Sequence, residues 1–272
     1  MGKINIQKDQ VNLLWTGGWD STFQLLQLLL IYRSSVKPFY LIHEERGSTH
    51  MEIKTMKEIK NYIFKTYPHT KDLLLPTQYY AVSDILPNAE ISSAFESILE
   101  NSHIGDQYDW LARLCKENNI SDMMLSVEKP LKINENYWDA NFDKMLFEEV
   151  INSQVVYRVN PKYKNSDIFT LFQNFVFPIR SVTKIEMNEI ATNKGWEKIM
   201  QMTWFCHNPT NKMTSCGICK PCQQLIKSGF GWRIKGRRKL ISLLYGKIIW
   251  PLKSTIKIVL NKLGLLPKQI TS

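Results

Sequence analysis

One short segment near the start of the chain limits the folds that this sequence can adopt. Apolar runs at residues 11–15 and 23–31 are separated by Gly17 and Gly18 and by several hydroxyl side chains. Glycines let backbone N–H groups turn toward one point, and the beginning of a helix adds its positive end. The segment therefore predicts a phosphate-binding turn between a strand and a helix. The residues expected to form it are Thr16, Gly17, Gly18, Trp19, Asp20, Ser21 and Thr22.

A Gly-Gly pair alone also occurs in tight strand-to-helix connections that bind nothing, so its surroundings matter. The segment has no Gly-Lys-Ser/Thr sequence of a Walker A loop. It also lacks the Gly-x-Gly-x-x-Gly sequence of dinucleotide-binding folds. If it binds phosphate, it belongs to a different class of loop.

The order of apolar patterns along the chain predicts an α/β protein. Strand-like runs and helix-like periodicities alternate, which indicates a doubly wound parallel sheet with the glycine turn at the carboxyl end of its first strand. A capping-box sequence at Thr183 and Glu186 predicts the start of one helix. The expected strands are residues 11–15, 39–43, 79–82, 123–127 and 175–179, and the expected helices are 21–32, 51–64, 107–118, 142–150 and 183–193.

Four of the five cysteines stand close together, in the arrangement Cys-x9-Cys-x2-Cys-x2-Cys: Cys206, Cys216, Cys219 and Cys222. Thiolates at this spacing can hold one tetrahedral Zn²⁺, with His207 as a substitute ligand. The alternatives are an iron–sulfur cluster, a pair of disulfides, or buried structural thiols. The fifth, Cys115, stands among apolar residues and is expected in the core.

The positive charge of the protein is concentrated at one end. The formal net charge is +10, and residues 231–272 contain ten Lys and Arg with no Asp or Glu, so the remainder is formally neutral. Apolar residues recur at helical steps among these cations, and Pro251 is expected to divide the segment into two helices. Such a segment fits an interfacial membrane helix, a helix packed on the body or on a second subunit, or, less well, a tRNA contact.

The first residues contain no apolar run of signal-peptide length, and the sequence has no uninterrupted apolar stretch that could span a bilayer. We therefore expect a cytoplasmic protein, with peripheral contact at the inner membrane face as an option for the tail.

Taken together, these motifs resemble those of a known family. Thr-Gly-Gly-Trp-Asp-Ser at 16–21 resembles the pyrophosphate loop of the PP-loop, or N-type, ATP pyrophosphatases. The run 204–222, with its four cysteines, resembles the terminus of the 7-cyano-7-deazaguanine synthases. The segment 177–184, ending at Lys184, and the basic loop 46–52 also resemble that family. The resemblance covers about residues 11–60 and 175–228 in the family's order.

The resemblance implies an adenine nucleotide alpha hydrolase-like fold and an ATP-dependent C–N ligase of 7-deazapurine, or queuosine, biosynthesis. Such enzymes adenylate a small carboxylate, release pyrophosphate and let ammonia displace AMP, using ATP, Mg²⁺ and Zn²⁺. It implies that Ser21 contacts the departing pyrophosphate and that Asp20 binds Mg²⁺ or shapes the loop. Lys184 is the preferred additional cation for pyrophosphate and Arg46 the second choice, with a solvated surface charge as the alternative for each.

Two segments depart from the family's pattern. Its Arg-Asn substrate segment has no counterpart at residues 105–113, and its Tyr-Pro-Asp-Cys-Arg-Pro segment is replaced by residues 134–139. The acceptor site is therefore expected to differ, with Gln107, Tyr108 and Trp110 as candidates for contacting a planar acceptor. Trp110 also fits a core position.

We expect one domain at residues 1–230, including a metal-binding segment at 204–224, and a basic tail at 231–272. The expected partners are a small carboxylate and ammonia, with a homodimer as an option and nucleic acid not favoured. Two other functions remain open. One is a PP-loop tRNA-modifying enzyme, which would need a persulfide cysteine near the loop, and the other is a nonenzymatic nucleotide-binding protein.

Overall fold

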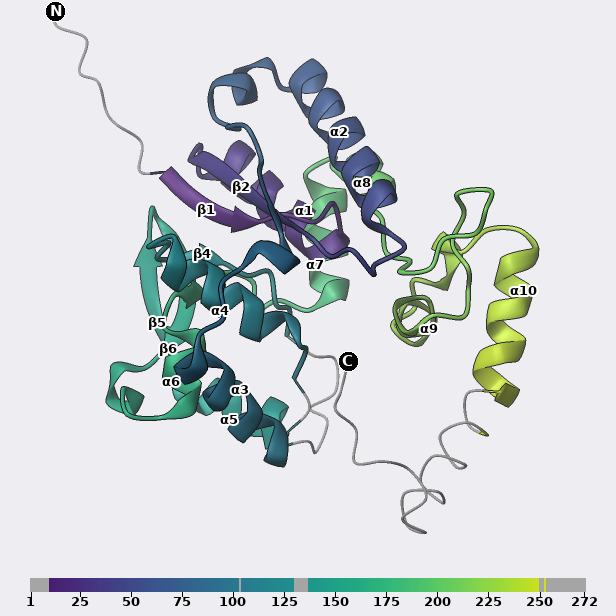
Figure 1. The fold of residues 1–272 in the computed structure, drawn as a ribbon. Coiled ribbons are helices and arrows are strands. Elements are labelled where there is room, and N and C mark those ends of the chain that lie inside the picture. The colour runs from purple at the N-terminus through teal and green to yellow at the C-terminus, as the bar shows by residue number, and fades with distance from the viewer. Residues whose placement is uncertain (1–9, 103, 130–136, 250–251, 253–272) are drawn as a thin grey trace, which may run out of the picture. The chain divides into compact units, whose positions relative to one another are not determined.

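The structure is a computed structural model that describes residues 10–102, 104–129, 137–249 and 252 (Figure 1). The chain forms two compact units, which we describe separately. The first comprises Met1–Glu44 and Glu52–Thr203, and the second comprises Glu45–Met51 and Trp204–Ser272. The expected domain boundary at residue 230 stays a prediction.

The first unit contains a five-stranded parallel sheet with the strand order β3-β2-β1-β4-β7. Its strands are β1 (Gln10–Leu14), β2 (Ser35–Ile42), β3 (Gln78–Ala81), β4 (Met123–Met124) and β7 (Phe175–Val176). Most residues of β2, β4 and β7 are buried, as expected for strands covered on both faces, whereas the edge strand β3 has none that is fully buried. This confirms the expectation of a mostly parallel α/β sheet.

Helices pack in two groups on this sheet (Figure 1). One group consists of α1 (Trp19–Leu26, continued as a π-helical segment Gln27–Ile31), α7 (Lys184–Asn193) and α8 (Glu197–Met202). The other consists of α3 (Ala89–Asn101), α4 (Gln107–Glu117) and α6 (Asp167–Phe172). Helix α2 (Thr49–Thr66) follows β2. Short 3-10 turns occupy Pro68–Asp72, Val82–Asp84 and Pro161–Tyr163.

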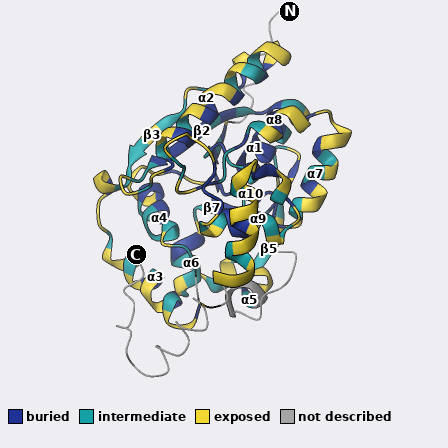
Figure 2. Ribbon diagram, turned by 90° about the vertical axis from the view of Figure 1, so that its right-hand side faces the viewer, coloured by how far each residue is buried: buried dark blue, intermediate teal, exposed yellow. Residues whose placement is uncertain are grey.

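Burial follows the sequence pattern of these helices. Figure 2 shows buried strands at the centre of the first unit and helices whose outer faces are exposed. Helix α7 begins with the expected capping box, in which the Thr183 hydroxyl accepts from the Glu186 N–H and the Glu186 carboxylate accepts from the Thr183 N–H. Cys115 is buried in the apolar cluster, as predicted.

The helix expected at residues 142–150 was wrong in its second half. Helix α5 spans Tyr137–Met145, and the chain then forms an antiparallel hairpin of β5 (Leu146–Ile151) and β6 (Gln154–Val159). The two turn residues, Asn152 and Ser153, both have positive φ, which suits the right-handed twist of a two-residue hairpin. The β-branched residues around this turn favour strands over a helix. The helices α3, α6 and α8 were not predicted.

The described part of the second unit contains the four clustered cysteines and several short helical segments. Helix α9 (Lys220–Lys227) is followed by a 3-10 turn at Gly231–Arg233 and by α10 (Arg237–Leu244), which continues as a π-helical segment Tyr245–Ile249. The break expected at Pro251 lies outside the described residues. Within the described part of the chain, none of the helices is long and apolar enough to cross a membrane.

Candidate nucleotide-binding site and metal centre

The glycine turn lies where the order of the sheet reverses. From β1 the chain proceeds through β2 and β3 to one edge of the sheet, and β4 then pairs on the other side of β1. Connections that diverge in this way leave a crevice outside the carboxyl ends of the two central strands, where open α/β sheets bind ligands. A cavity of about 150 Å³ lies there, between the end of β1 and the segment that follows β4.

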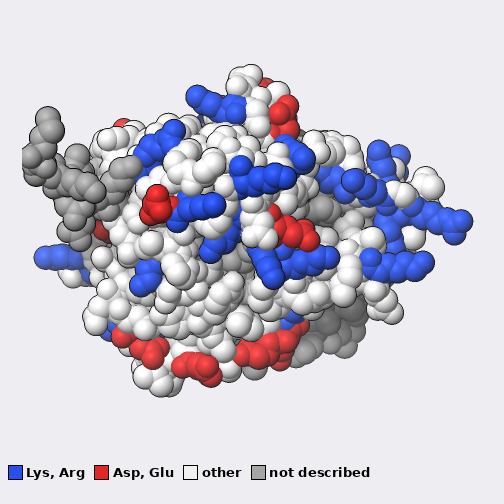
Figure 3. Space-filling model, turned by 90° about the horizontal axis from the view of Figure 1, so that it is seen from above, with Lys and Arg blue, Asp and Glu red and all other residues white. Residues whose placement is uncertain are grey.

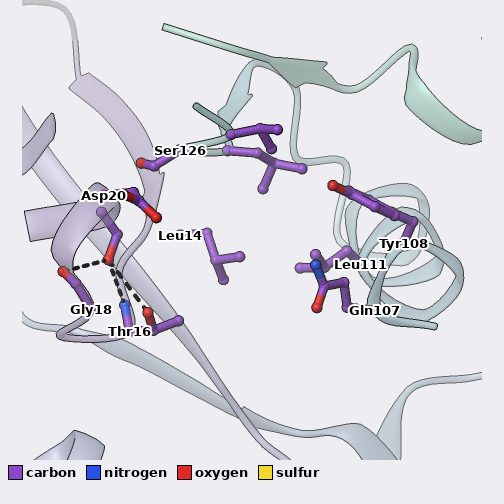
Figure 4. A pocket seen from close by; sticks show the side chains of 11 residues that line it. Leu14, Thr16, Gly18, Asp20, Gln107, Tyr108, Leu111 and Ser126 are labelled. Carbon is purple, nitrogen blue, oxygen red and sulfur yellow. Dashed lines mark hydrogen bonds between the residues drawn. The ribbon is translucent and has the colours of Figure 1, made fainter. Parts of the chain in front are cut away.

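The turn is held in one conformation by its glycines and by Ser21. Gly17 has a φ of +68°, and a Cβ atom there would lie 3.1 Å from Met56 and 3.3 Å from the carbonyl of Glu52 on α2. Gly18 is the N-cap of α1 and accepts the first helical hydrogen bond, from Thr22 N–H at 3.0 Å. The Ser21 hydroxyl accepts from Thr16 N–H at 3.3 Å, so it folds back over the turn (Figure 4).

The structure separates the seven predicted loop residues into two sets. Thr16, Gly18, Asp20 and Ser21 line the cavity. Trp19 and Thr22 are buried, and the Thr22 hydroxyl accepts a hydrogen bond from Trp15 Nε1 at 3.1 Å. Gly17 packs against α2. The loop therefore presents its hydroxyls and the first turn of α1 to the cavity, while its bulky residues anchor it.

A charged cluster lies beside the loop. Lys184 Nζ is 2.9 Å from Glu128 Oε1 and 3.4 Å from Asp20 Oδ1, and its side chain is only 18% exposed. This placement does not fit the alternative of a solvated surface charge for Lys184. Two contacts hold Glu128 in place, since its carbonyl accepts from Arg180 Nη1 at 3.0 Å and the next residue, Lys129, donates to the Val182 carbonyl.

Burial and neighbouring charge perturb this cluster. Desolvation raises the pKa of Glu128, and the nearby Asp20 carboxylate raises it further, although Lys184 opposes both effects. Burial alone would lower the pKa of Lys184, but the two carboxylates outweigh it and the pKa is raised. Glu128 Oε2 is buried and accepts no hydrogen bond within the described residues, and the buried Asp20 Oδ1 is satisfied there only by its ion pair with Lys184. Buried carboxylate oxygens of this kind favour a bound cation.

The opposite wall of the cavity comes from α4 and from the segment after β4. Gln107, Tyr108 and Leu111 face the loop across the cavity (Figure 4). Ser126 also lines it, and its hydroxyl oxygen is buried without a hydrogen-bond partner in the described structure. Trp110 is partly buried against the apolar cluster and does not line the cavity. Of the three acceptor candidates, Gln107 and Tyr108 are therefore placed at the site.

The size of the cavity limits what it can enclose. Pockets that bury whole small-molecule ligands usually measure about 300–1,000 Å³. At about 150 Å³, this cavity has room for part of a nucleotide or for a small group beside the loop. The rest of a nucleotide would lie along the open edge of the sheet.

The four cysteines of the second unit form a compact set of sulfur ligands. Their Sγ atoms all lie within 4.8 Å of one another, with separations of 3.4 Å for Cys219–Cys222, 3.8 Å for Cys206–Cys219 and 3.9 Å for Cys216–Cys222. Four sulfurs on one tetrahedral ion at about 2.3 Å would be about 3.8 Å apart. The set could therefore hold one metal ion, and it needs no contribution from His207.

Backbone N–H groups point at these sulfurs, as they do in metal-binding knuckles. Cys216 Sγ accepts from the N–H groups of Ile218 and Cys219 at 3.4 and 3.3 Å, and Cys206 Sγ accepts from Cys216 N–H at 3.2 Å. Interactions with the neighbouring thiols of Cys206 and Cys222 lower the pKa of the Cys219 thiol. By contrast, burial raises the pKa of Cys115 to about 12.

Arg46, the second-choice cation, belongs to the second unit, where its carbonyl accepts hydrogen bonds from the N–H and the hydroxyl of Thr49. Its assignment to pyrophosphate stays a prediction. Sequence reasoning missed Glu128 and Ser126. The only signal for them was their position just after the fourth predicted strand, at the sheet edge that also carries the loop.

Comparisons with known proteins add little to this picture. No family model matches the chain, and no curated protein matches it. Among solved structures, a U34-tRNA thiolase NcsA from Methanococcus maripaludis with its [4Fe-4S] cluster is similar at a TM-score of 0.40 and 12% identity, over 91% of this chain and 75% of the thiolase. A likeness at that level carries no argument about function.

Proposed function

We propose that this chain is an ATP-dependent enzyme of the PP-loop type, which adenylates a small carboxylate and then transfers nitrogen to it. The closest reaction type is that of the 7-cyano-7-deazaguanine synthases. One observation carries the proposal. The Gly17–Gly18 turn opens helix α1 at the reversal point of a parallel sheet, and its hydroxyls line a cavity there.

The loop would act on the departing pyrophosphate. When a carboxylate oxygen attacks the α-phosphorus, a new O–P bond forms, the bond between the α-phosphorus and the bridging oxygen breaks, and negative charge builds on pyrophosphate. Donors already aimed at that charge stabilise the transition state more than the ground state. In this loop the donors would be the first N–H groups of α1 and the hydroxyls of Thr16 and Ser21.

The charged cluster would bind the metal ion through its carboxylates and contact the phosphate through Lys184. Asp20 and Glu128 supply buried carboxylate oxygens suited to Mg²⁺, whose chemistry when bound would be to neutralise phosphate charge. In the structure Lys184 bridges both carboxylates. Because its pKa is raised, Lys184 stays protonated and can turn from these carboxylates toward an incoming phosphate.

The acceptor would enter from the α4 side. Gln107, Tyr108 and Ser126 offer hydrogen-bonding groups across the cavity from the loop. Attack by ammonia on the acyl carbon would then expel AMP and, after loss of a proton, give an amide. In a second cycle, the amide oxygen would attack the α-phosphorus of another ATP and release pyrophosphate. Loss of two protons from the amide nitrogen and departure of the oxygen with AMP would then give a nitrile.

We propose Zn²⁺ as the ion held by the four cysteines. The sulfur separations suit a single ion, whereas the larger body of a four-iron cluster holds its thiolates further apart. Four protein ligands complete a tetrahedron and leave no open position, so the role of this ion would be structural. All four thiols would then be occupied, and the fifth, in Cys115, is buried. This argues against a cysteine persulfide as the reactive group.

The test is an exchange assay on the full-length protein. Labelled pyrophosphate should enter ATP when 7-carboxy-7-deazaguanine, or another acid from a panel of small carboxylates, is added with Mg²⁺. Adding ammonium should convert exchange into net release of AMP and pyrophosphate. Ser21→Ala should lower the rate by about 10²–10³-fold if the hydroxyl stabilises the transition state. Ser97→Ala, which removes a hydroxyl on α3, is the matched control.

Two outcomes would reject the proposal. Bound ATP with no exchange for any acid would favour a nonenzymatic nucleotide-binding protein. Pyrophosphate release that needs tRNA and a sulfur donor, together with iron in the purified protein, would favour the alternative of a PP-loop tRNA-modifying enzyme.

A further inference from the structure

The outer face of α10 and its π-helical continuation is apolar and exposed. Leu240, Leu244 and Ile248 recur at intervals of four residues and are 65%, 59% and 54% exposed. Ile241 and Leu243 flank them and are exposed as well. These five residues, which we call the apolar ridge, give one helix an unusual concentration of large exposed aliphatic side chains.

The helix is held by its opposite face, which fixes the direction of the ridge. Ser242 is fully buried, and Gln223 Nε2 on α9 donates to its hydroxyl and carbonyl and to the carbonyl of Gly217 in the metal knuckle. A Cβ atom on Gly217 would lie 2.8 Å from the carbonyl of Arg238, so α10 packs directly on the knuckle backbone. The polar face of α10 is thus the docked face within the second unit.

A basic groove runs beside the ridge. It has a volume of about 910 Å³ and is lined by Lys212, Arg237 and Arg238, by the amide and hydroxyl side chains of residues 208–214, and by Tyr245, with no acidic residue among its lining. Figure 3 shows Lys and Arg side chains gathered at the right of that view. The sequence of residues 231–272 contains no acid at all.

We propose that the apolar ridge and the basic groove together form a docking surface for a membrane that contains anionic phospholipids. The ridge would enter the boundary between headgroups and acyl chains, and the cations of the groove would contact lipid phosphates. A peripheral helix binds in this way when apolar burial and attraction to anionic lipid act together.

Charge and side-chain type favour lipid over the other possible partners. A nucleic-acid surface of this charge would be expected to interleave aromatic rings with its cations, whereas the ridge consists of aliphatic side chains. A second copy of this chain would bring the same cations against themselves, which opposes self-association. A phospholipid surface matches both the apolar ridge and the basic groove.

The test uses the full-length protein and sedimentation with vesicles. Binding should be strong to vesicles of phosphatidylcholine with 30% phosphatidylglycerol, weak to pure phosphatidylcholine, and reduced by salt. The triple variant Leu240→Gln/Leu244→Gln/Ile248→Gln should lower the partition coefficient at least about tenfold. Arg237→Gln and Lys212→Gln should each lower it about fivefold, the equivalent of about 1 kcal/mol per cation.

Matched controls distinguish specific docking from nonspecific adsorption to vesicles and from misfolding. Leu86→Gln and Val150→Gln alter aliphatic side chains that are 62% and 65% exposed in the first unit, and binding should not change. Every variant should keep the circular dichroism and the metal content of the parent protein. Ammonia-dependent pyrophosphate release, where present, should be unaffected, which separates this proposal from the proposed function.

Three outcomes would overturn the proposal. The first is equal binding to neutral and anionic vesicles, or binding to neither. The second is a dimer, by analytical ultracentrifugation, that the triple leucine and isoleucine substitution converts to a monomer without any vesicle binding. The third is tight binding of tRNA that the cation variants abolish, with no vesicle binding.

Discussion

Replacement of Gly17 by alanine should damage the loop in two ways that can be measured separately. The first is conformational, because Gly17 has a φ of +68°, a region that side chains with a Cβ atom rarely adopt. The second is steric, because the added atom would meet α2. Both effects follow from the backbone of the turn and do not depend on any bound ligand.

The structure allows each contribution to be sized. Holding a non-glycine residue in the left-handed region costs about 1–2 kcal/mol. The new Cβ would lie 3.1 Å from Met56 Cγ, 3.3 Å from Glu52 O and 3.4 Å from Thr55 Cγ2, so a side chain and a helix backbone must shift. Overpacking of that kind costs about 1–3 kcal/mol. The expected loss of unfolding free energy is therefore about 2–5 kcal/mol.

Gly195 is a matched control for the conformational part. Its φ is +70°, and a Cβ atom there would meet nothing within 4 Å. Gly195→Ala should therefore lose only about 1–2 kcal/mol in urea unfolding. The difference between the two variants isolates the contact with α2. Gly17→Ala, but not Gly195→Ala, should also weaken the binding of inorganic pyrophosphate, measured by isothermal titration calorimetry.

The reasoning would be refuted if the two variants lost the same stability within about 0.5 kcal/mol, the level at which independent substitutions usually agree. That result would mean that α2 does not restrain the turn. If stability fell as expected while pyrophosphate affinity stayed unchanged, the loop geometry would stand and its assignment to phosphate would fail.

Three further predictions concern the metal centre and the charged cluster. Cys219→Ser should remove most of the bound metal, measured by atomic absorption, and destabilise the second unit, whereas Cys115→Ser should leave the metal content unchanged. Lys184→Met should cost about 1–3 kcal/mol of unfolding free energy, because two half-buried carboxylates lose their partner, and adding Glu128→Gln should restore part of it. The raised pKa of Glu128 means that the folded protein binds this proton more tightly than the unfolded chain does. The stability loss in Lys184→Met should therefore be largest near pH 7 and should shrink as the pH falls through the raised pKa of Glu128. Urea unfolding at several pH values that showed the reverse trend would contradict the burial of Glu128.

The parts of the molecule that sequence alone predicted are those set by local physics. The turn at residues 16–21, the capping box at Thr183 and the cysteine spacing each depend on residues close together in the chain. Glycine conformations, helix caps and metal-ligand distances are local requirements, so a short segment reveals them. All five strands of the parallel sheet were located for a similar reason, since buried strands are short apolar runs.

The features that sequence missed depend on tertiary contacts. The hairpin at residues 146–159 was taken in part for a helix because its apolar residues suit either structure over a few turns. Its position depends on partners elsewhere, such as the buried amide pair in which Gln154 and Gln24 donate to each other at 3.1 and 2.8 Å. Glu128 became significant only when Lys184, which is 56 residues away in sequence, was placed beside it.

The topology also explains why the two sides of the cavity can differ in how far they follow a family pattern. The loop side is constrained by the end of β1 and by α2, which leave Gly17 no room for a side chain. The opposite side is built from Gln107, Tyr108 and Leu111 of α4 and from residues 125–127 after β4, which line the cavity across from the loop. If the proposed function holds, a change at Gln107 or Tyr108 would alter the acceptor while the glycine turn stays intact. The departures from the synthase pattern at residues 105–113 fall on the α4 side of the cavity. We therefore expect the acceptor acid to be the feature in which this protein differs most from the synthases that its loop resembles.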